Sequence, residues 1–337
     1  MKSEILQLLR EAARSGSFLS GQELCTRFSV SRTAVWKAME QLKAEGYEIE
    51  AVRNRGYRLK AEPEDVYSAA GIRSLLGTQT IAGSLQFAAQ IGSTNEAAAQ
   101  AAREGAPEGY LVAADRQTAG RGRRGRTWIS PAGCNVYFSV MLRPQIRPDR
   151  APMMTLLMAQ AVCEAMEELC PASAPESMRP LIKWPNDIVI DGRKVCGMLT
   201  EMSAEMGDVR YVVIGVGINV KRQEFAPELE GHAVSLEEAW GIGVSRSALT
   251  AAVCNRFEPL YQRFLREQDL GFLRRPYLKR LVNAGRQVRV LDPAGEYDGI
   301  ARGINETGEL LVELPDGTVR EVYAGEVSVR GIYGYTE

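Results

Sequence analysis

The sequence predicts an α+β protein of several domains, and three observations support this. The chain has 337 residues, more than one ordinary domain holds, with 45% hydrophobic and 25% charged residues, as in globular proteins. The N-terminal part reads as short helices followed by two strands, and the middle mixes helices with strands. The C-terminal part contains short strands and turns only. We therefore expect three domains, over residues 1–62, 66–284 and 285–337.

The N-terminal segment has the pattern of a helix-turn-helix. Apolar residues at helical spacing from Ile5 to Leu9 predict a first helix, and Gly21 to Phe28 predicts a second. Ser31 can cap a third helix over residues 32–45, and Gly46 suits the position just beyond its end. In DNA-binding proteins of this kind the third helix enters the major groove.

The outer face of the third helix and the segment after it are basic. Two short strands, Tyr47 to Val52 and Tyr57 to Lys60, flank an Arg-rich tip and predict a wing that touches phosphates. Residues 1–60 hold 11 Lys and Arg against 7 Glu, whereas the whole chain has a net charge of −1. A winged helix that binds DNA is the favoured interpretation, and a protein-interaction domain of the same topology is the alternative. The expected DNA-contacting residues are Ser31, Arg32, Thr33, Trp36, Lys37, Arg53 and Arg55.

A polar, Pro-containing linker at residues 61–65 precedes the central domain. Farther on, Ser93 and Glu96 fit a capping box at the start of an Ala-rich helix. The hydroxyl and amide groups at this helix N-terminus could equally hold a polar group of a ligand. Both interpretations agree with the spacing.

The most distinctive stretch runs from Asp115 to Ser130 and reads DRQTAGRGRRGRTWIS. Glycines allow close approach of the backbone to a ligand, and arginines form bidentate bonds to phosphate. A solvated basic loop is the alternative. The dinucleotide fingerprint is excluded because a turn and a strand over residues 135–142 follow, instead of a helix, and a Walker loop is excluded because Gly-Lys-Ser/Thr does not occur.

The apolar segment over residues 151–170 reads as a buried helix, because three glutamates interrupt it. Later, a hairpin turning at Asp191-Gly192 is expected, with Lys194 just beyond the turn. Gly197 lies within the second strand of this hairpin and suggests a close backbone approach by a ligand. Toward the C-terminus, short strands between turns predict a small antiparallel barrel of SH3-like size.

Composition excludes several classes of protein. Six cysteines without Cys-x-x-Cys spacing argue against a zinc site or a disulfide framework and for a reducing, cytoplasmic location. The single histidine, His232, and the lack of a G-x-S-x-G turn argue against a Ser-His-Asp hydrolase. Charged residues near the start interrupt any signal peptide, and we expect no membrane association.

Five motifs together resemble those of the bifunctional biotin–protein ligases, bacterial enzymes that also repress biotin synthesis. In chain order they are GSTN (92–95), QTAGRGRRGRTW (117–128), KWPND (183–187), GRKVCGMLTE (192–201) and GVGINV (215–220). The resemblance covers essentially the whole chain. It implies a winged helix-turn-helix, a mixed α/β ligase domain related to class II aminoacyl-tRNA synthetases, and an SH3-like C-terminal β-barrel.

The resemblance also implies a reaction in two steps. Biotin and ATP, the latter with Mg²⁺, give biotinyl-5′-adenylate and pyrophosphate. The biotinyl group then passes to a specific lysine on the biotin carrier domain of a carboxylase. The adenylate would also act as corepressor, so the implied partners include operator DNA and a second copy of the chain, in a homodimer formed with the adenylate. A metal held directly by protein side chains is not implied.

Roles for individual residues follow from the matching motif positions. The resemblance implies that biotin is held by Ser93, Thr94, Asn95, Gln117, Arg121, Gly122, Arg123, Lys194 and Gly197. It implies that the adenylate is contacted by Trp128, Asn186, Asn219, Arg121 and Arg123. Lys194, with the two arginines, would stabilise charge on the α-phosphate, and Asp187 would assist the acceptor lysine. Because a loop of arginines and glycines buries little apolar surface, we expect it to order only over the adenylate.

Other functions stay open on the sequence. The central domain would be a sensor without chemistry if it bound a nucleotide-like ligand and released no pyrophosphate. A lipoate ligase uses a related domain, but the Arg-rich motif argues against it. The chain would also be a ligase alone if its N-terminal domain did not regulate, which an operator mobility shift tests.

Overall fold

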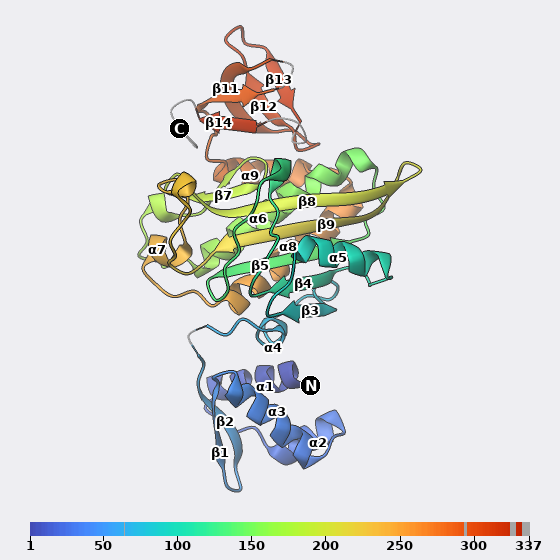
Figure 1. Cartoon of the computed structure of the whole chain (residues 1–337), viewed down its shortest axis with the longest axis vertical. Coiled ribbons are helices and arrows are strands. Elements are labelled where there is room, and N and C mark those ends of the chain that lie inside the picture. The colour runs from blue at the N-terminus through green and yellow to red at the C-terminus, as the bar shows by residue number, and fades with distance from the viewer. Residues whose placement is uncertain (64, 293–294, 324–327, 332–337) are drawn as a thin grey trace. The chain divides into compact units, whose positions relative to one another are not determined.

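The computed structural model describes residues 1–63, 65–292, 295–323 and 328–331 and consists of two compact units (Figure 1). The first unit comprises residues 1–77 and 243–252, and the second comprises residues 78–242 and 253–337. The three expected domain ranges stay a prediction, and the last residues of the C-terminal range, 332–337, lie outside the described part of the chain.

The elements follow in chain order. The helices are α1 (Lys2–Arg14), α2 (Gly21–Phe28), α3 (Arg32–Ala44), α4 (Ala69–Arg73), α5 (Thr94–Arg103), α6 (Ala151–Leu169), α7 (Leu236–Trp240), α8 (Arg246–Glu267) and α9 (Arg274–Arg280). The strands are β1 (Glu48–Val52), β2 (Gly56–Ala61), β3 (Leu85–Ala88), β4 (Tyr110–Ala114), β5 (Asn135–Leu142), β6 (Leu181–Lys183), β7 (Asp187–Ile190), β8 (Arg193–Glu205), β9 (Asp208–Asn219), β10 (Gln287–Leu291), β11 (Tyr297–Ile304), β12 (Leu310–Glu313), β13 (Val319–Val322) and β14 (Ser328–Gly331).

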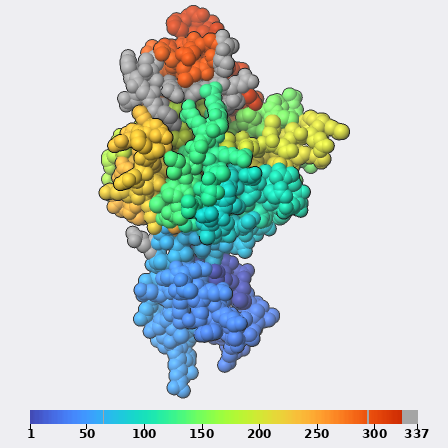
Figure 2. Space-filling model, viewed as in Figure 1, coloured from blue at the N-terminus to red at the C-terminus, as the bar shows by residue number. Residues whose placement is uncertain are grey.

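Helices α1, α2 and α3 and the hairpin β1–β2 share one hydrophobic core in the first unit. The caps of α3 are as predicted: Ser31 Oγ accepts from the Ala34 N–H at 3.2 Å, and Gly46 adopts a φ of 99° beyond the helix end. The hairpin projects from this unit as a narrow finger (Figure 2). The predicted winged helix-turn-helix is therefore confirmed.

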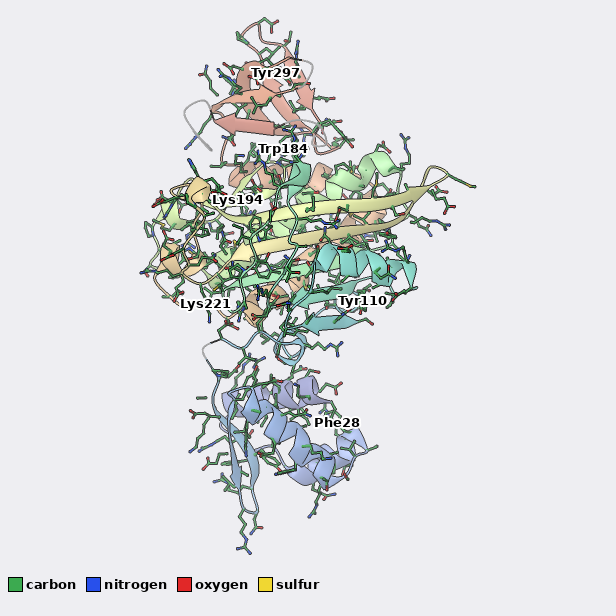
Figure 3. All side chains as sticks on the ribbon, in the orientation of Figure 1. Phe28, Tyr110, Trp184, Lys194, Lys221 and Tyr297 are labelled. Carbon is green, nitrogen blue, oxygen red and sulfur yellow. The ribbon has the colours of Figure 1, made fainter. Side chains whose placement is uncertain are left out.

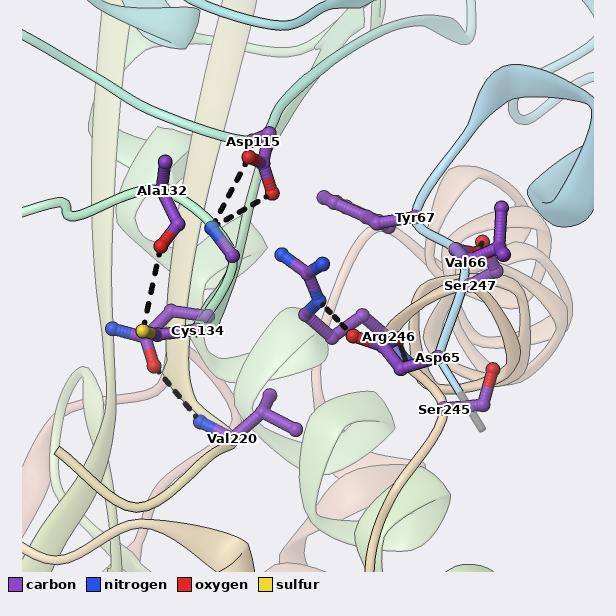
Figure 4. A network of polar contacts seen from close by, with 12 residues as sticks. Asp65, Val66, Tyr67, Asp115, Ala132, Cys134, Val220, Ser245, Arg246 and Ser247 are labelled. Carbon is purple, nitrogen blue, oxygen red and sulfur yellow. Dashed lines mark hydrogen bonds and ion pairs between the residues drawn. The ribbon is translucent and has the colours of Figure 1, made fainter. Parts of the chain in front are cut away.

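The segment that leaves the wing is fixed to the start of α8 within the same unit (Figure 4). Arg246 Nε donates to Asp65 Oδ2 at 2.6 Å, and the two side chains are only 6% and 3% exposed. Ser247 Oγ donates to the Val66 carbonyl at 2.6 Å. Breaking a buried ion pair leaves an uncompensated charge, so this pair determines the path of the segment. The sequence predicts only a polar linker over residues 61–65, because the partners of Asp65 and Val66 lie 181 residues away in the chain.

The second unit is built on a seven-stranded sheet in the order β3-β4-β5-β9-β8-β7-β6. β3 and β4 are parallel, and the other neighbouring strands are antiparallel. Helix α5 packs on β4, β5 and β9, whereas α6 packs on β6 to β9. The two helices lie on opposite faces, since α5 contacts Gly215 and α6 contacts Thr200, the strand partner of Ile214. β5, between them, is buried along its whole length.

The predicted buried helix over residues 151–170 is α6, and most of its side chains are inaccessible. Among the described residues, no helix combines the length and the apolar character needed to cross a bilayer.

Strands β10 to β14 form a separate antiparallel sheet in the order β13-β12-β11-β10-β14. The predicted C-terminal all-β domain is confirmed in its described part. Trp184, labelled in Figure 3, links the central sheet to this domain, because its Nε1 donates to the Gly308 carbonyl at 3.1 Å.

Candidate active site

Two adjoining cavities, of about 50 and 280 Å³, lie where the Arg- and Gly-rich loop crosses the central sheet. All nine residues predicted to hold one ligand line the smaller cavity. Of the five residues predicted for the other ligand, four line the larger cavity, and Arg121 lines only the smaller one. The residues that line both are Gly122, Arg123, Trp128, Asn186 and Lys194. The structure thus brings the predicted site residues together from segments far apart in the chain.

The start of α5 forms the polar wall of the smaller cavity. The Thr94 N–H donates to Gln117 Oε1 at 2.8 Å, so a side chain from another segment caps this helix. The predicted capping box is wrong, because the Ser93 side chain makes no capping hydrogen bond. Glu96 instead lies 3.3 Å from Arg121 Nη2. The buried Ser93 hydroxyl is therefore left facing the cavity.

The side chain of Asn95 fits against β9 because Gly215 has no side chain. A Cβ on Gly215 would lie 2.0 Å from Asn95 Oδ1. The amide is held on its other side, since Nδ2 donates to Glu201 Oε2 at 2.7 Å and to the Leu199 carbonyl at 3.2 Å. Asn95 is only 4% exposed, so these bonds fix its orientation at the cavity wall.

Two further glycines make room for the indole of Trp128. Gly197 of β8 and Gly217 of β9 are strand partners. A Cβ on Gly217 would lie 2.6 Å from Trp128 Nε1, and one on Gly197 would lie 2.9 Å from Trp128 Cζ3. We expected a ligand to approach Gly197 closely. Gly197 does line the smaller cavity, but its nearest neighbours there are Trp128 and Lys194.

Lys194 lies at the start of β8, just after the predicted turn (Figure 3). That turn is confirmed, with Asp191 and Gly192 at φ values of 49° and 71°. The Lys194 N–H donates to the His232 carbonyl at 2.8 Å, and the Lys194 carbonyl accepts from Val234 at 3.0 Å. Both bonds fix the backbone, so the position of the ammonium depends mainly on its own side chain.

The Lys194 ammonium is held between an anion and a ring. Its Nζ lies 2.7 Å from Asp187 Oδ1 and 5.3 Å from the centre of the Trp128 ring. The side chain of Asp187 is 10% exposed and that of Lys194 is 26% exposed, so solvent screens the pair only in part. The arrangement points one cation into the region that both cavities share.

The Arg- and Gly-rich loop forms a tight turn. The Gly122 N–H donates to the Arg126 carbonyl at 2.7 Å, and the Trp128 N–H donates to the Gly120 carbonyl at 2.9 Å. Arg123 Nη1 donates to Asn186 Oδ1 at 2.9 Å. Burial lowers the pKa of the Arg123 guanidinium, and the Asp187 carboxylate acts in the opposite direction. Ordering of the loop by a ligand stays a prediction.

Several residues of the larger cavity were missed by sequence reasoning. They are Lys183, Gln223, Glu224, Phe225, Leu229 and His232. Lys183 belongs to the KWPND motif, which was a usable signal, whereas residues 221–232 match none of the five motifs. Asn135 determines where this segment lies, since its Oδ1 accepts from the Val220 N–H and from Gln223 Nε2, both at 3.0 Å.

The seven predicted DNA-contacting residues are all exposed in the first unit. Arg32 and Arg53 line an open groove of about 480 Å³ between α3 and the hairpin. Arg55 stacks on Phe18, with its guanidinium carbon 4.0 Å from the ring centre, so its side chain is held against that ring. Trp36 is 53% exposed on α3, which is unusual for so large an apolar side chain.

Comparisons with known proteins agree with this arrangement. Residues 87–219 match the model of the biotin/lipoate A/B protein ligase family, residues 2–58 match an HTH domain, and residues 284–330 match the biotin protein ligase C-terminal domain. The sequence is 38% identical to the bifunctional ligase/repressor BirA of Bacillus subtilis, over 98% of both chains. It is 32% identical to the Escherichia coli protein of the same name, over 94% of both. A biotin protein ligase from Aquifex aeolicus, solved with biotin and ATP, superposes with a TM-score of 0.63 and 29% identity, covering 74% of this chain and 99% of that one.

Proposed function

Because the chain belongs to the family of bifunctional biotin–protein ligases and repressors, we propose that its two cavities hold the two halves of biotinyl-5′-adenylate. The protein is a ligase with biotin and ATP as substrates, and its N-terminal domain binds DNA as a repressor. A biotin carrier domain is the acceptor. We further propose the roles of individual residues, how the metal ion is held, and the oligomeric state of the repressor.

The observation that carries the proposal is the shared wall of the two cavities. The smaller cavity is lined by amides and hydroxyls, which suit the polar ring of biotin. The larger one is lined by Trp184, Phe225 and Asn219, which suit a nucleoside. Lys194 and Arg123 lie in the wall between them, where the biotin carboxylate meets the α-phosphate.

In the first step, an oxygen of the biotin carboxylate attacks the α-phosphorus of ATP, and the bond from that phosphorus to pyrophosphate breaks. Negative charge concentrates on the phosphoryl oxygens in the transition state. Lys194 and Arg123 are fixed cations beside that position, and a preorganised charge typically contributes a few kcal/mol to stabilising such a state. Asp187 positions the Lys194 ammonium.

In the second step, the amine of the acceptor lysine attacks the carbonyl carbon of the mixed anhydride. The bond to AMP breaks, and the nitrogen loses a proton as the amide forms. We assign Asp187 a second role here, as the carboxylate nearest to the incoming amine. It is buried to 7% exposure in the wall of the larger cavity, which suits a group that acts on one proton at a fixed place.

Mg²⁺ accompanies the triphosphate and supplies further charge neutralisation when bound. Among the described residues, no group of three or more His, Cys, Asp or Glu side chains is arranged to hold a metal ion. Asp187 and Glu224 are the carboxylates that line the larger cavity. The residues present therefore fit an ion held mainly by phosphate oxygens and water, with at most these two side chains.

One assay separates this function from its alternatives. The full chain is incubated with biotin, ATP, Mg²⁺ and a biotin carrier domain, and pyrophosphate and carrier biotinylation are measured. Biotin-dependent pyrophosphate and one biotin per carrier are expected. Binding of both ligands without pyrophosphate would instead indicate a sensor, and activity with lipoate in place of biotin would indicate a lipoate ligase.

For repression, we propose that the adenylate-bound protein forms a homodimer that places two winged helices on a palindromic operator. Sedimentation with and without biotinyl-adenylate tests the dimer, and a mass that the adenylate leaves unchanged would contradict it. The winged helix supplies exposed cations, with Arg53 at the hairpin tip and Arg32 at the start of α3.

Replacing Arg53 by alanine is expected to weaken operator binding by roughly tenfold and to lower the slope of log K against log salt by about one, because one phosphate contact is lost. Arg14→Ala is the matched control, since Arg14 is equally exposed in the first unit but does not line the groove. Ligase activity should stay unchanged in both variants. Equal operator affinity of the two would exclude a phosphate contact by Arg53.

A further inference from the structure

Behind the smaller cavity, one buried hydroxyl joins two of the residues that line it. Ser139 of β5 is 0% exposed, does not line the cavity, and faces Gly215 across the sheet. Its Oγ lies 2.6 Å from Asn95 Oδ1 and 2.8 Å from Thr94 Oγ1. Both contacts are short enough to need a proton between the oxygens.

The direction of each hydrogen bond follows from the donors available. Asn95 Nδ2 faces only acceptors, the Leu199 carbonyl and Glu201 Oε2, so the amide orientation is unambiguous and Oδ1 faces Ser139. The single Ser139 proton must therefore point to Asn95 Oδ1. The Thr94 hydroxyl has two acceptors within reach, Ser139 Oγ at 2.8 Å and Gln117 Oε1 at 3.1 Å, and the shorter contact is satisfied only if Thr94 donates to Ser139.

The same reasoning fixes Gln117. Its Oε1 accepts the Thr94 N–H at 2.8 Å, and its Nε2 donates to Ser130 Oγ at 3.1 Å. Ser130 accepts that bond because its own proton goes to the Trp128 carbonyl at 3.0 Å. Gln117 is thus left with one N–H to offer to the cavity.

The polarity of the cavity wall is consequently set by residues outside it. Because the Thr94 proton goes to Ser139 and the orientation of the Asn95 amide is fixed, Thr94 Oγ1 and Asn95 Oδ1 each offer a lone pair, and Gln117 offers a donor. A cyclic urea has the complementary edge, with two N–H donors on either side of a carbonyl acceptor. A dithiolane ring has no such groups.

We propose that Ser139, Glu201 and Ser130 are positioning residues that lock the hydrogen-bond polarity of the smaller cavity and so select a cyclic urea. This inference rests on the proposed function, because it assigns the urea ring of biotin to that cavity. Ser139 has the central part, since it holds both acceptors at once. Without it, the Thr94 hydroxyl keeps only the longer contact to Gln117 Oε1, at 3.1 Å, and can turn its proton toward the ligand.

Ser139→Ala tests the lock in the full-length protein. The variant removes the donor to the buried Asn95 Oδ1, and leaving such an acceptor unpaired costs about 1–3 kcal/mol. The Kd for biotin, measured by calorimetry, should therefore rise roughly 5- to 150-fold. The maximal rate of pyrophosphate release at saturating biotin should change by less than about threefold, because the reacting carboxylate lies at the far end of the ligand.

A second probe distinguishes the lock from general loosening of the site. In the two cyclic carbamate analogues of biotin, a ring oxygen replaces one ureido N–H. That oxygen, an acceptor, would then face Thr94 Oγ1 or Asn95 Oδ1, which are acceptors as well. The native protein should reject at least one analogue by a large factor, as sites built around hydrogen bonds do. Ser139→Ala should narrow that preference by at least about tenfold, because the Thr94 hydroxyl, then held only by Gln117 Oε1 at 3.1 Å, can donate to the ring oxygen instead.

Thr155→Val is the matched control, since it removes a buried hydroxyl that pairs with Thr200 at 2.7 Å on the opposite face of the sheet. It should leave biotin affinity and the carbamate preference unchanged. If Ser139→Ala does not fold, Glu201→Leu at an exposed position is the second test. Asn95 Nδ2 then keeps only the Leu199 carbonyl at 3.2 Å, so the amide can flip and offer a donor, and a smaller rise in Kd with a smaller narrowing of the carbamate preference is expected.

The outcomes are distinct. Unchanged biotin affinity and carbamate preference in a folded Ser139→Ala protein, or in Glu201→Leu where that variant replaces it, would overturn the polarity lock while leaving the ligase assignment intact. A native protein that neither binds biotin nor forms the adenylate would overturn the proposed function itself, and the lock with it.

Discussion

Replacing Lys194 by alanine is expected to slow formation of biotinyl-adenylate by at least about 100-fold, because preorganised charge at a transition state contributes on that scale. The ammonium lies in the wall common to both cavities and is held 2.7 Å from Asp187 Oδ1. Removing it also takes a cation away from the Asp187 carboxylate, so repulsion between this carboxylate and the α-phosphate adds to the lost attraction. Single-turnover release of pyrophosphate measures this step directly.

Transfer from preformed biotinyl-adenylate to the carrier should be affected much less, because the mixed anhydride already exists. Lys279→Ala is the control, an exposed lysine of α9 that lines neither cavity, and its rate should equal that of the native protein. Lys194→Arg keeps the charge but not the compact ammonium, so an intermediate rate is expected. Normal pyrophosphate release by Lys194→Ala would remove Lys194 from the mechanism.

Gly215→Ala is expected to weaken biotin binding strongly although it adds only one methyl group. The new Cβ would lie 2.0 Å from Asn95 Oδ1, and three hydrogen bonds, to Ser139, Leu199 and Glu201, prevent the amide from moving aside freely. Overpacking of this kind typically costs about 1–3 kcal/mol. Because the loss falls on a wall of the ligand cavity, the Kd for biotin should rise by roughly the corresponding 5- to 150-fold.

A double variant separates the clash from other effects of the methyl group. In Gly215→Ala/Asn95→Ala the amide that the new Cβ strikes is gone, so thermal stability should recover relative to Gly215→Ala. Biotin affinity should not recover, because Asn95 no longer lines the cavity. Gly215 lies in the extended strand β9 and has no positive φ, so alanine fits its backbone. Native-like affinity in the single variant would show that Asn95 does not need its observed place.

The local structure was predicted well because it depends on neighbours in the chain. The caps of α3, the turn at Asp191-Gly192 and the strand over residues 135–142 all follow from side-chain spacing and turn chemistry within a few residues. The residues of the smaller cavity were also found, since their motifs resemble a known family. The predicted capping box at Ser93 was wrong. The sequence shows that Ser93 precedes the helix, but it does not show that Gln117, from another segment, accepts the N–H of Thr94.

What the sequence determined by itself, then, is the order of domains, most of their helices and strands, the predicted residues of the smaller cavity and part of the lining of the larger one. Only the tertiary structure decided how these residues are oriented. Asn95 has its place because Gly215, 120 positions later in the numbering, lacks a side chain, and Ser139 holds it from a third segment. Asp65 likewise finds Arg246 across 181 residues. Hydrogen bonds and steric fit act through space over a few ångströms, so contacts between distant segments leave no periodic signal in the chain.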